Sequence, residues 1–282
     1  MCLTACASIL WGTVFVAADI GLQYANAFVL VFLRFSLASI VIGGLALLFD
    51  SKLGVAREFR KWSIWLLGFV DALGFLFQYI GQSLTNASDA TLLANLAPVL
   101  VPLVAWRICR EGISRLQTVA MMLGLSGLVL MAWPSYGSIG GNILGDLSLL
   151  GASASFAFFI VLSKRLNAVT TASALAVIVT IAVFVAPAAL ILGGLSTTIL
   201  TLTANCLYAS IYMGVVCTVV PMVLYLRGLR SISTSESGTL LLLEVLSGLI
   251  LAASLLGQIP TGYELLASGT IVTALALGVA FR

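Results

Sequence analysis

Long apolar segments alternate with short polar connections along almost the whole chain. A helix rises about 1.5 Å per residue, so about 20 apolar residues are needed to cross the hydrocarbon core of a bilayer. The pattern predicts an all-α integral membrane protein with ten transmembrane helices. These helices are expected at residues 3–22, 28–49, 63–83, 91–106, 116–133, 146–163, 173–194, 205–226, 237–257 and 263–281.

The composition excludes most classes of soluble protein. Of 282 residues, 61% are hydrophobic and only 8% are charged, whereas soluble domains carry about 25% charged residues. The absence of histidine removes the commonest metal ligand and the usual base that activates a nucleophile. The five cysteines form no C-x-x-C pair. We therefore expect no cofactor, no metal, no catalytic residue and no contact with nucleic acid.

The basic residues predict how the chain is oriented in the membrane. All Lys and Arg residues except Arg34 follow even-numbered helices. Positive charge gathers on the cytoplasmic side, so both termini are expected in the cytoplasm, as in a multi-pass protein of the plasma membrane or bacterial inner membrane. The chain begins almost inside its first helix, which leaves open whether a short leader precedes it.

The two halves of the sequence resemble each other at an offset of 147 residues. Gly81 then matches Gly228, and Asp89 matches Glu236. Each half contains five predicted spans, and because five is odd, the second half must enter the membrane the opposite way up. We expect one repeat at residues 1–142 and an inverted repeat at residues 143–282. Such repeats are typical of transporters that bind their substrate near the membrane midplane.

Several short motifs occur in a characteristic order along the chain. They are Trp11-Gly12, Arg34-Phe35, the run from Ala87 to Pro98, Glu111 with Gln117, and Leu243-Glu244. In these motifs the chain resembles the EamA branch of the drug/metabolite transporter superfamily over nearly its whole length. The resemblance implies a ten-helix secondary transporter, often an exporter of amino acids or related metabolites.

Four ionisable residues fall inside the predicted spans, where charge is costly and often functional. Asp19 and Arg34 lie toward the outer side, and they form either a structural ion pair or an outer gate. Asp71 and Glu244 have no basic residue predicted at their own depth. Their carboxyls are then protonated, in contact with water or bound to a cation. A coupling or substrate role and a hydrogen-bonded structural role both remain open for them.

Polar residues at helical spacing form stripes on four predicted helices, and such stripes face a cavity or other helices. We expect a midplane substrate site with an apolar wall and polar groups beside it. Its predicted residues are Trp11, Phe15, Phe75, Gln78, Asn95, Phe159 and Glu244. The predicted coupling or gating residues are Asp19, Arg34, Asp71, Glu244 and Pro98, where proline interrupts the helix. Close packing of small residues is the alternative explanation of the stripes.

These features favour a secondary transporter that moves a small amphipathic metabolite, such as an amino acid, by alternating access, as an exporter or exchanger. The alternative is a transporter of cationic drug-like substrates or other metabolites by proton antiport. A membrane enzyme would need clustered catalytic groups, and a channel would need a ring of charges or a filter motif; the sequence has neither. Substrate identity, direction, proton coupling and oligomeric state are left open.

Overall fold

The membrane helices expected from the sequence are present in a computed structural model. It describes residues 1–84, 93–133, 142–193, 203–255, 257 and 259–280, except for a few side chains within those ranges, among them that of Asp19. Every regular element in these ranges is helical. The elements are α1 (Cys2–Leu22), α2 (Ala27–Leu53), α3 (Val55–Glu58), α4 (Trp62–Leu84), α6 (Ala97–Cys109), α7 (Arg115–Ala132), α8 (Ile143–Arg165), α9 (Thr171–Gly193), α11 (Ala204–Gly214), the π-helix η2 (Val215–Val219), α12 (Val220–Leu229), α13 (Thr234–Leu255) and α14 (Gly262–Ala280).

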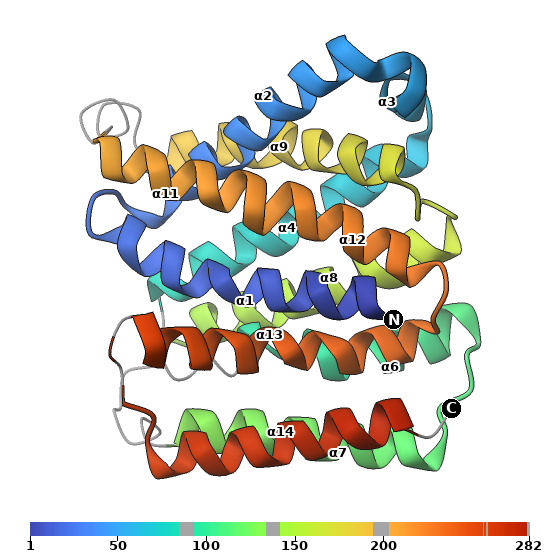
Figure 1. Cartoon of the computed structure of the whole chain (residues 1–282), viewed down its shortest axis with the longest axis vertical. Helices are drawn as coiled ribbons and strands as arrows, with labels where there is room; N and C mark the ends of the chain where they lie inside the picture. Colours follow the sequence, from blue (N-terminus) through green and yellow to red (C-terminus); the bar gives the residue numbers. More distant parts are fainter. Residues whose placement is uncertain (85–92, 134–141, 194–202, 256, 258, 281–282) are drawn as a thin grey trace.

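The helices agree in number and position with the ten predicted spans. In the described part of the chain, eight helical segments are long and apolar enough to cross a membrane, and α11, η2 and α12 together form one of them. Two shorter apolar helices, α6 and α14, lie at the remaining two predicted positions. Figure 1 shows the helices side by side, with the start of α1 and the end of α14 at the same end of the bundle. The prediction of an all-α membrane protein is confirmed.

One predicted span begins later than expected. The fourth was placed at residues 91–106, but α6 begins at Ala97, after a turn at Asn95 and a non-helical Leu96. Pro98 in the first turn of α6 has no N–H to donate to the carbonyl of Ala94, and its ring crowds that carbonyl, which accounts for the break. The hydroxyl of Ser153 on α8 donates to the carbonyls of Leu93 (2.5 Å) and Ala94 (3.0 Å). Carbonyls released by the break are thereby satisfied by protein.

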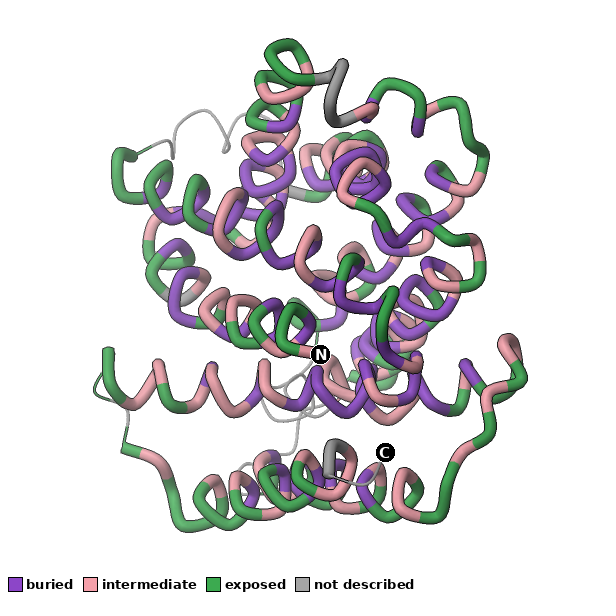
Figure 2. The backbone as a smooth tube through the Cα atoms, turned by 45° about the vertical axis from the view of Figure 1, so that its right-hand side comes forward, coloured by how far each residue is buried: buried purple, intermediate pink, exposed green. Residues whose placement is uncertain are grey.

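Burial is concentrated among the central helices. The helices in closest contact are α4 with α8, α14 with α7, α1 with α13, and α2 with α9. The largest buried cluster joins side chains of α2, α4, α8, α9 and α12. Figure 2 shows the α7–α14 pair at one edge of the molecule, mostly exposed or half-buried.

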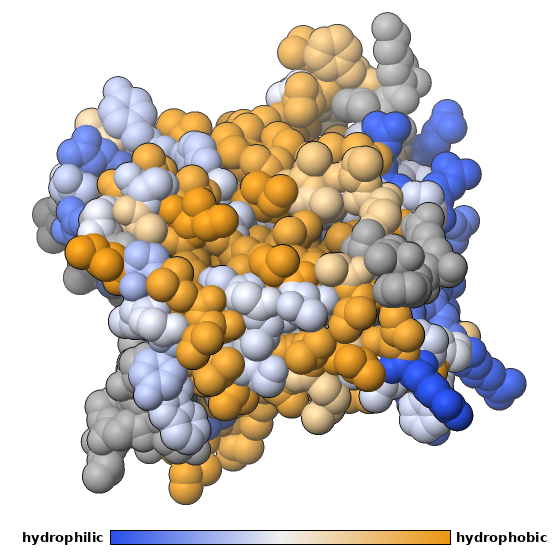
Figure 3. Space-filling view, turned by 60° about the horizontal axis from the view of Figure 1, so that its bottom comes forward, coloured by the Kyte–Doolittle hydropathy of each residue, from blue (hydrophilic) through white to orange (hydrophobic). Residues whose placement is uncertain are grey.

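The outer surface suits contact with lipid. Large apolar side chains such as Leu47 and Ile191 are 91% and 81% exposed. Figure 3 shows apolar surface across the middle of the molecule, with the most hydrophilic side chains mainly at the end that carries the chain termini. Because lipid cannot hydrogen-bond to polar groups, this band of apolar surface is the part that the bilayer would cover.

Candidate functional site

Arg34 lies in the interior of the bundle, on α2, with only 6% of its surface exposed. Its Nε donates to the hydroxyl of Thr218 (2.7 Å), and its Nη2 donates to the carbonyl of Cys217 (3.1 Å). Both acceptors belong to η2, near the middle of the membrane span that α11, η2 and α12 form together. The π-helix shifts the backbone bonding by one residue, and such turns are frequent at functional sites.

Aromatic side chains surround the same guanidinium. Its central carbon lies 5.3 Å from the ring centre of Phe75 on α4 and 5.4 Å from that of Phe35 on α2. The two rings are 4.8 Å apart, and cation–π attraction at such distances stabilises a buried charge. The side chain of Tyr79, one turn further along α4, is also close enough to interact with Arg34. The charge is therefore held by groups from three segments that are far apart in the sequence.

Two carboxyl groups share the electrostatic field of Arg34. Asp71 on α4 is almost fully buried, and Glu244 on α13 is half-buried; each lies close enough to Arg34 to interact with its charge. This corrects the expectation that no basic residue lies at their depth. That expectation failed because the arginine comes from α2, and only helix packing determines that α2, α4 and α13 face one another.

The backbones of these three helices are not packed closely against one another, so their contacts are made by long side chains. In the described structure, no two of α2, α4 and α13 are among the helix pairs in extensive contact. Long side chains such as Arg34 therefore span the distance between them. Glu244 and Gln78 stay half-buried although they lie well inside their helices, which is consistent with polar groups facing an interior space. The Gln78 amide has no hydrogen-bond partner among the described residues.

A second aromatic contact adjoins Glu244. The ring of Trp11 on α1 lies 5.0 Å from that of Tyr225 on α12, which is fully buried. Tyr225 is in turn within electrostatic range of Glu244. The structure thus places Phe75 and Glu244, two of the predicted substrate residues, near Arg34, and a third, Trp11, against Tyr225.

The remaining predicted residues are placed differently. Asn95 is half-buried at the helix break, and Pro98 is buried against Gly238 of α13. Phe15 is 40% exposed and lies against Gly248 of α13. Phe159 is 4% exposed within the main core, where its observed role is packing. The side chain of Asp19 lies outside the described residues, so the pair that it was expected to form with Arg34 stays a prediction.

Sequence reasoning missed three partners of this cluster: Thr218, Tyr79 and Tyr225. Thr218 could most easily have been found from the sequence, because it is a polar residue in an apolar helix, shortly before Pro221. Tyr79 follows the predicted Gln78 directly but falls outside the spacing of that stripe. No pattern in the sequence distinguishes Tyr225 from an interface tyrosine.

Close backbone packing brings α1 against the same part of α13. A Cβ added at Gly12 would lie 2.5 Å from the carbonyl oxygen of Glu244 and 2.9 Å from the backbone nitrogen of Gly248. The hydroxyl of Ser247 donates to the carbonyl of Ile9 at 3.2 Å. At Gly12, close packing of small residues, the alternative explanation of the stripes, therefore holds.

A polar contact closes the end of the bundle that carries the predicted cytoplasmic loops. Glu111, between α6 and α7, accepts hydrogen bonds from the backbone N–H of Thr234 (3.0 Å) and from its hydroxyl (2.7 Å). Lys164, in the last turn of α8, lies 3.5 Å from Glu111 and donates to the carbonyl of Ile232. We call these four residues the Glu111 latch. A carboxylate is favoured at a helix N-terminus, so this contact ties the α6–α7 connection to the start of α13.

In the described ranges, no three His, Cys, Asp or Glu residues gather in a way that could hold a metal ion. The arrangement can instead hold charged and polar groups of a ligand. It combines one guanidinium, two carboxyls and aromatic surface at mid-depth.

Comparison with known proteins places the chain among transporters. The model of the EamA-like transporter family matches residues 1–133 and again residues 143–279. The uncharacterized transporter YwfM of Bacillus subtilis is 25% identical over 260 residues, which cover 89% of this chain and 84% of that protein. YdfC, another uncharacterized transporter of Bacillus subtilis, is 25% identical over 270 residues, covering 94% and 85%. One solved crystal structure has the same fold, with a TM-score of 0.84 at 21% identity over 99% of this chain and 95% of its own.

Proposed function

The chain belongs to the EamA-like transporter family, and we propose that it is a secondary transporter that carries a small amphipathic metabolite, such as an amino acid, by alternating access. Membership of this family supports a transporter that moves small molecules across a bilayer. The nature of the substrate and the transport cycle are the parts that we add. We propose export or exchange as the direction.

The observation that carries the substrate proposal is the grouping of Arg34, Asp71 and Glu244. An amino acid has a carboxylate and an ammonium group, and a buried site must offer a partner of opposite charge to each. Arg34 offers a planar set of donors that suits a carboxylate. Glu244, half-buried beside it, offers an acceptor for an ammonium group. Trp11 and Phe75 supply apolar surface for a side chain.

The proposed cycle uses the two ends of the helices in turn. The Glu111 latch holds the ends of α6, α8 and α13 together on the predicted cytoplasmic side. Opening toward that side requires the latch to break. The π-helix η2 adjoins the site, and the helix break before Ala97 is a second irregular segment. Irregular backbone of this kind absorbs changes of helix direction. We propose residues 1–142 and 143–282 as the two repeats that move relative to each other.

A second candidate is a cationic drug-like substrate exchanged for protons. It is favoured by the excess of two carboxyls over one guanidinium at the site. If both Asp71 and Glu244 are ionised, one negative charge is left over, and a proton or an organic cation would balance it. Substrate and proton would then compete for the same carboxyl, which links their two gradients.

A counterflow experiment in proteoliposomes distinguishes the candidates. Vesicles loaded with one solute are challenged with amino acids, organic cations and other metabolites, with and without a pH gradient. For a zwitterion, Arg34→Gln and Glu244→Gln should each reduce exchange by at least tenfold. For proton antiport, Asp71→Asn or Glu244→Gln should abolish the response to the pH gradient. Glu264→Gln, at the start of α14, is the charge-matched control.

The outcome that contradicts the site is also defined. If Arg34→Gln, Asp71→Asn and Glu244→Gln all keep full exchange and an unchanged response to pH, the cluster is structural and the substrate binds elsewhere. If no solute exchanges in liposomes that contain folded protein, the proposed transport of small metabolites fails.

A further inference from the structure

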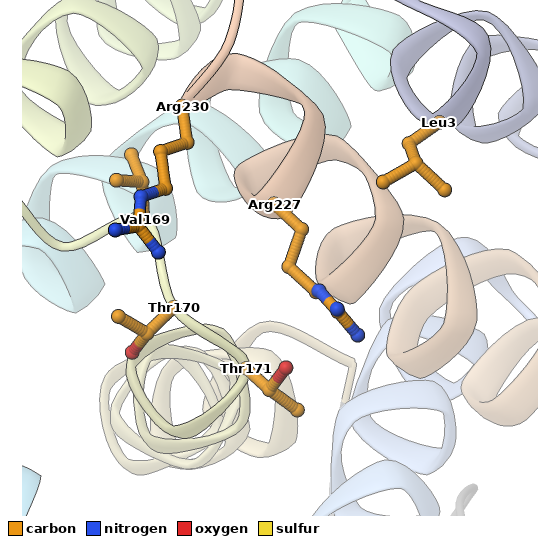
Figure 4. A pocket seen from close by; sticks show the side chains of 6 residues that line it. All are labelled: Leu3, Val169, Thr170, Thr171, Arg227 and Arg230. Carbon is orange, nitrogen blue, oxygen red and sulfur yellow. The ribbon is translucent and has the colours of Figure 1, made fainter.

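A cavity lies away from the Arg34 cluster, at the predicted cytoplasmic end of the bundle. It has a volume of about 400 Å³ and opens between α1, α9 and α12. Figure 4 shows its lining side chains, which are Leu3, Val169, Thr170, Thr171, Arg227 and Arg230. No part of the transport proposal uses this cavity.

Two arginines on one face of α12 make the cavity strongly basic. Arg227 lies in the last turn of α12, and Arg230 follows three residues later, so their side chains are neighbours. Both are exposed, and neither has a hydrogen-bond or acidic partner within the described ranges. Both guanidinium groups line the same cavity, so an anion bound there would be attracted by two positive charges that have no other partner among the described residues.

The facing wall of the cavity adds neutral donors. Thr170 caps α9, because its hydroxyl accepts a hydrogen bond from the N–H of Ser173 at 3.1 Å. The N–H groups of Thr171 and Ala172 precede the first helical hydrogen bond of α9, and such groups favour anions. The Thr171 hydroxyl has no partner in the part of the chain that the structure describes, and Figure 4 shows its oxygen on the side of Arg227.

A carboxylate nearby does not cancel this charge. Glu58 of α3 accepts a hydrogen bond from the hydroxyl of Ser173 at 2.9 Å and is paired with Lys61. It does not line the cavity. The Glu58–Lys61 pair is neutral as a unit, so the two arginines keep their excess positive charge.

We propose that this cavity binds a phosphate group. A phosphate presents several oxygens in different directions, and it can therefore engage two guanidiniums and the start of α9 together. A carboxylate, with two oxygens in one plane, would leave some of these donors unused. Two sources fit the position: the headgroup of an anionic phospholipid in the cytoplasmic leaflet, and a free phosphate compound in the cytoplasm.

The test measures binding to the purified full-length protein after its lipids have been removed. The probes are inorganic phosphate, titrated by calorimetry, and phosphatidylglycerol, counted by native mass spectrometry against phosphatidylcholine. The double variant Arg227→Gln/Arg230→Gln should lose at least tenfold in affinity. The control Arg107→Gln/Arg110→Gln removes two arginines at the same spacing from the end of α6 and should bind as the wild type does.

The two probes separate the two sources. Binding of phosphatidylglycerol that phosphate does not displace identifies a lipid site, and binding of phosphate alone identifies a soluble ligand. An equal loss of affinity in both double variants would mean that the probes respond to general surface charge, and it would overturn the proposal. The proposal would also be overturned if neither probe bound to the wild-type protein. Thr171→Val leaves the charges in place and should weaken binding severalfold; if the double variant fails to fold, unchanged affinity in Thr171→Val overturns the proposal.

Discussion

Replacing Gly12 by alanine tests the close contact between α1 and α13. A Cβ at this position would lie 2.5 Å from the carbonyl oxygen of Glu244 and 2.9 Å from the nitrogen of Gly248. The Ser247 hydroxyl lies nearer still, but it belongs to a side chain that can rotate, whereas no side-chain rotation can move these two backbone atoms. The helices must separate, and the backbone that carries Glu244 must move with α13.

The expected magnitude follows from two opposing effects. Overpacking a tight contact costs about 1–3 kcal/mol, and with backbone on both sides we expect the upper end of that range. Alanine also favours helix over glycine by up to about 1 kcal/mol. Gly43→Ala isolates this second effect, because a Cβ at Gly43 has no atom within 4 Å. The difference between the two variants should therefore be about 3 kcal/mol, with Gly12→Ala the less stable.

The assay is reversible unfolding in mixed micelles, in which a neutral detergent is replaced stepwise by sodium dodecyl sulfate. Gly43→Ala should unfold at the wild-type composition or slightly beyond it, and Gly12→Ala should unfold earlier. Exchange activity in liposomes should fall in Gly12→Ala alone, since Glu244 is displaced. Equal stability of the two variants would refute the close approach of α1 to α13 at this point.

Three further expectations concern other parts of the molecule. Glu111→Gln removes a charge that accepts hydrogen bonds at the start of α13, at a cost of about 1–2 kcal/mol. Hydrogen exchange of the Thr234 amide should therefore accelerate about tenfold or more, while exchange in α8 stays unchanged. Equal exchange rates at Thr234 in the variant and the wild type would show that the Glu111 latch does not hold α13. Ser153→Ala leaves carbonyls unsatisfied at the helix break before α6 and should lower stability by about 1–3 kcal/mol, whereas wild-type unfolding would mean that water satisfies them. Single cysteines replacing Arg60 and Thr261, in a background without native cysteines, should react with impermeant reagents from opposite sides of the membrane. Reaction from the same side would disprove the ten-span topology.

Much of the candidate site could be found from the sequence, because ionisable residues in apolar spans are conspicuous. Arg34, Asp71 and Glu244 were recognised in this way. Their grouping was not, and Arg34 was paired with Asp19 because both were placed at a similar depth. Sequence separation carries no information on which helices face one another. The hydrogen bonds from Arg34 to Cys217 and Thr218 could therefore not be predicted from the sequence.

By itself, the sequence determined the all-α membrane fold and the positions of the apolar helices, and it predicted ten spans and an orientation. These follow from local properties, namely the length of apolar runs and the side on which basic residues gather. Tertiary structure alone decided which polar groups come together: Arg34 near two carboxyls, Glu111 at the start of α13, and Arg227 and Thr171 in the lining of one cavity. The physical reason is that helical periodicity specifies which residues share a face, whereas the partner of each face depends on how helices distant in sequence pack together.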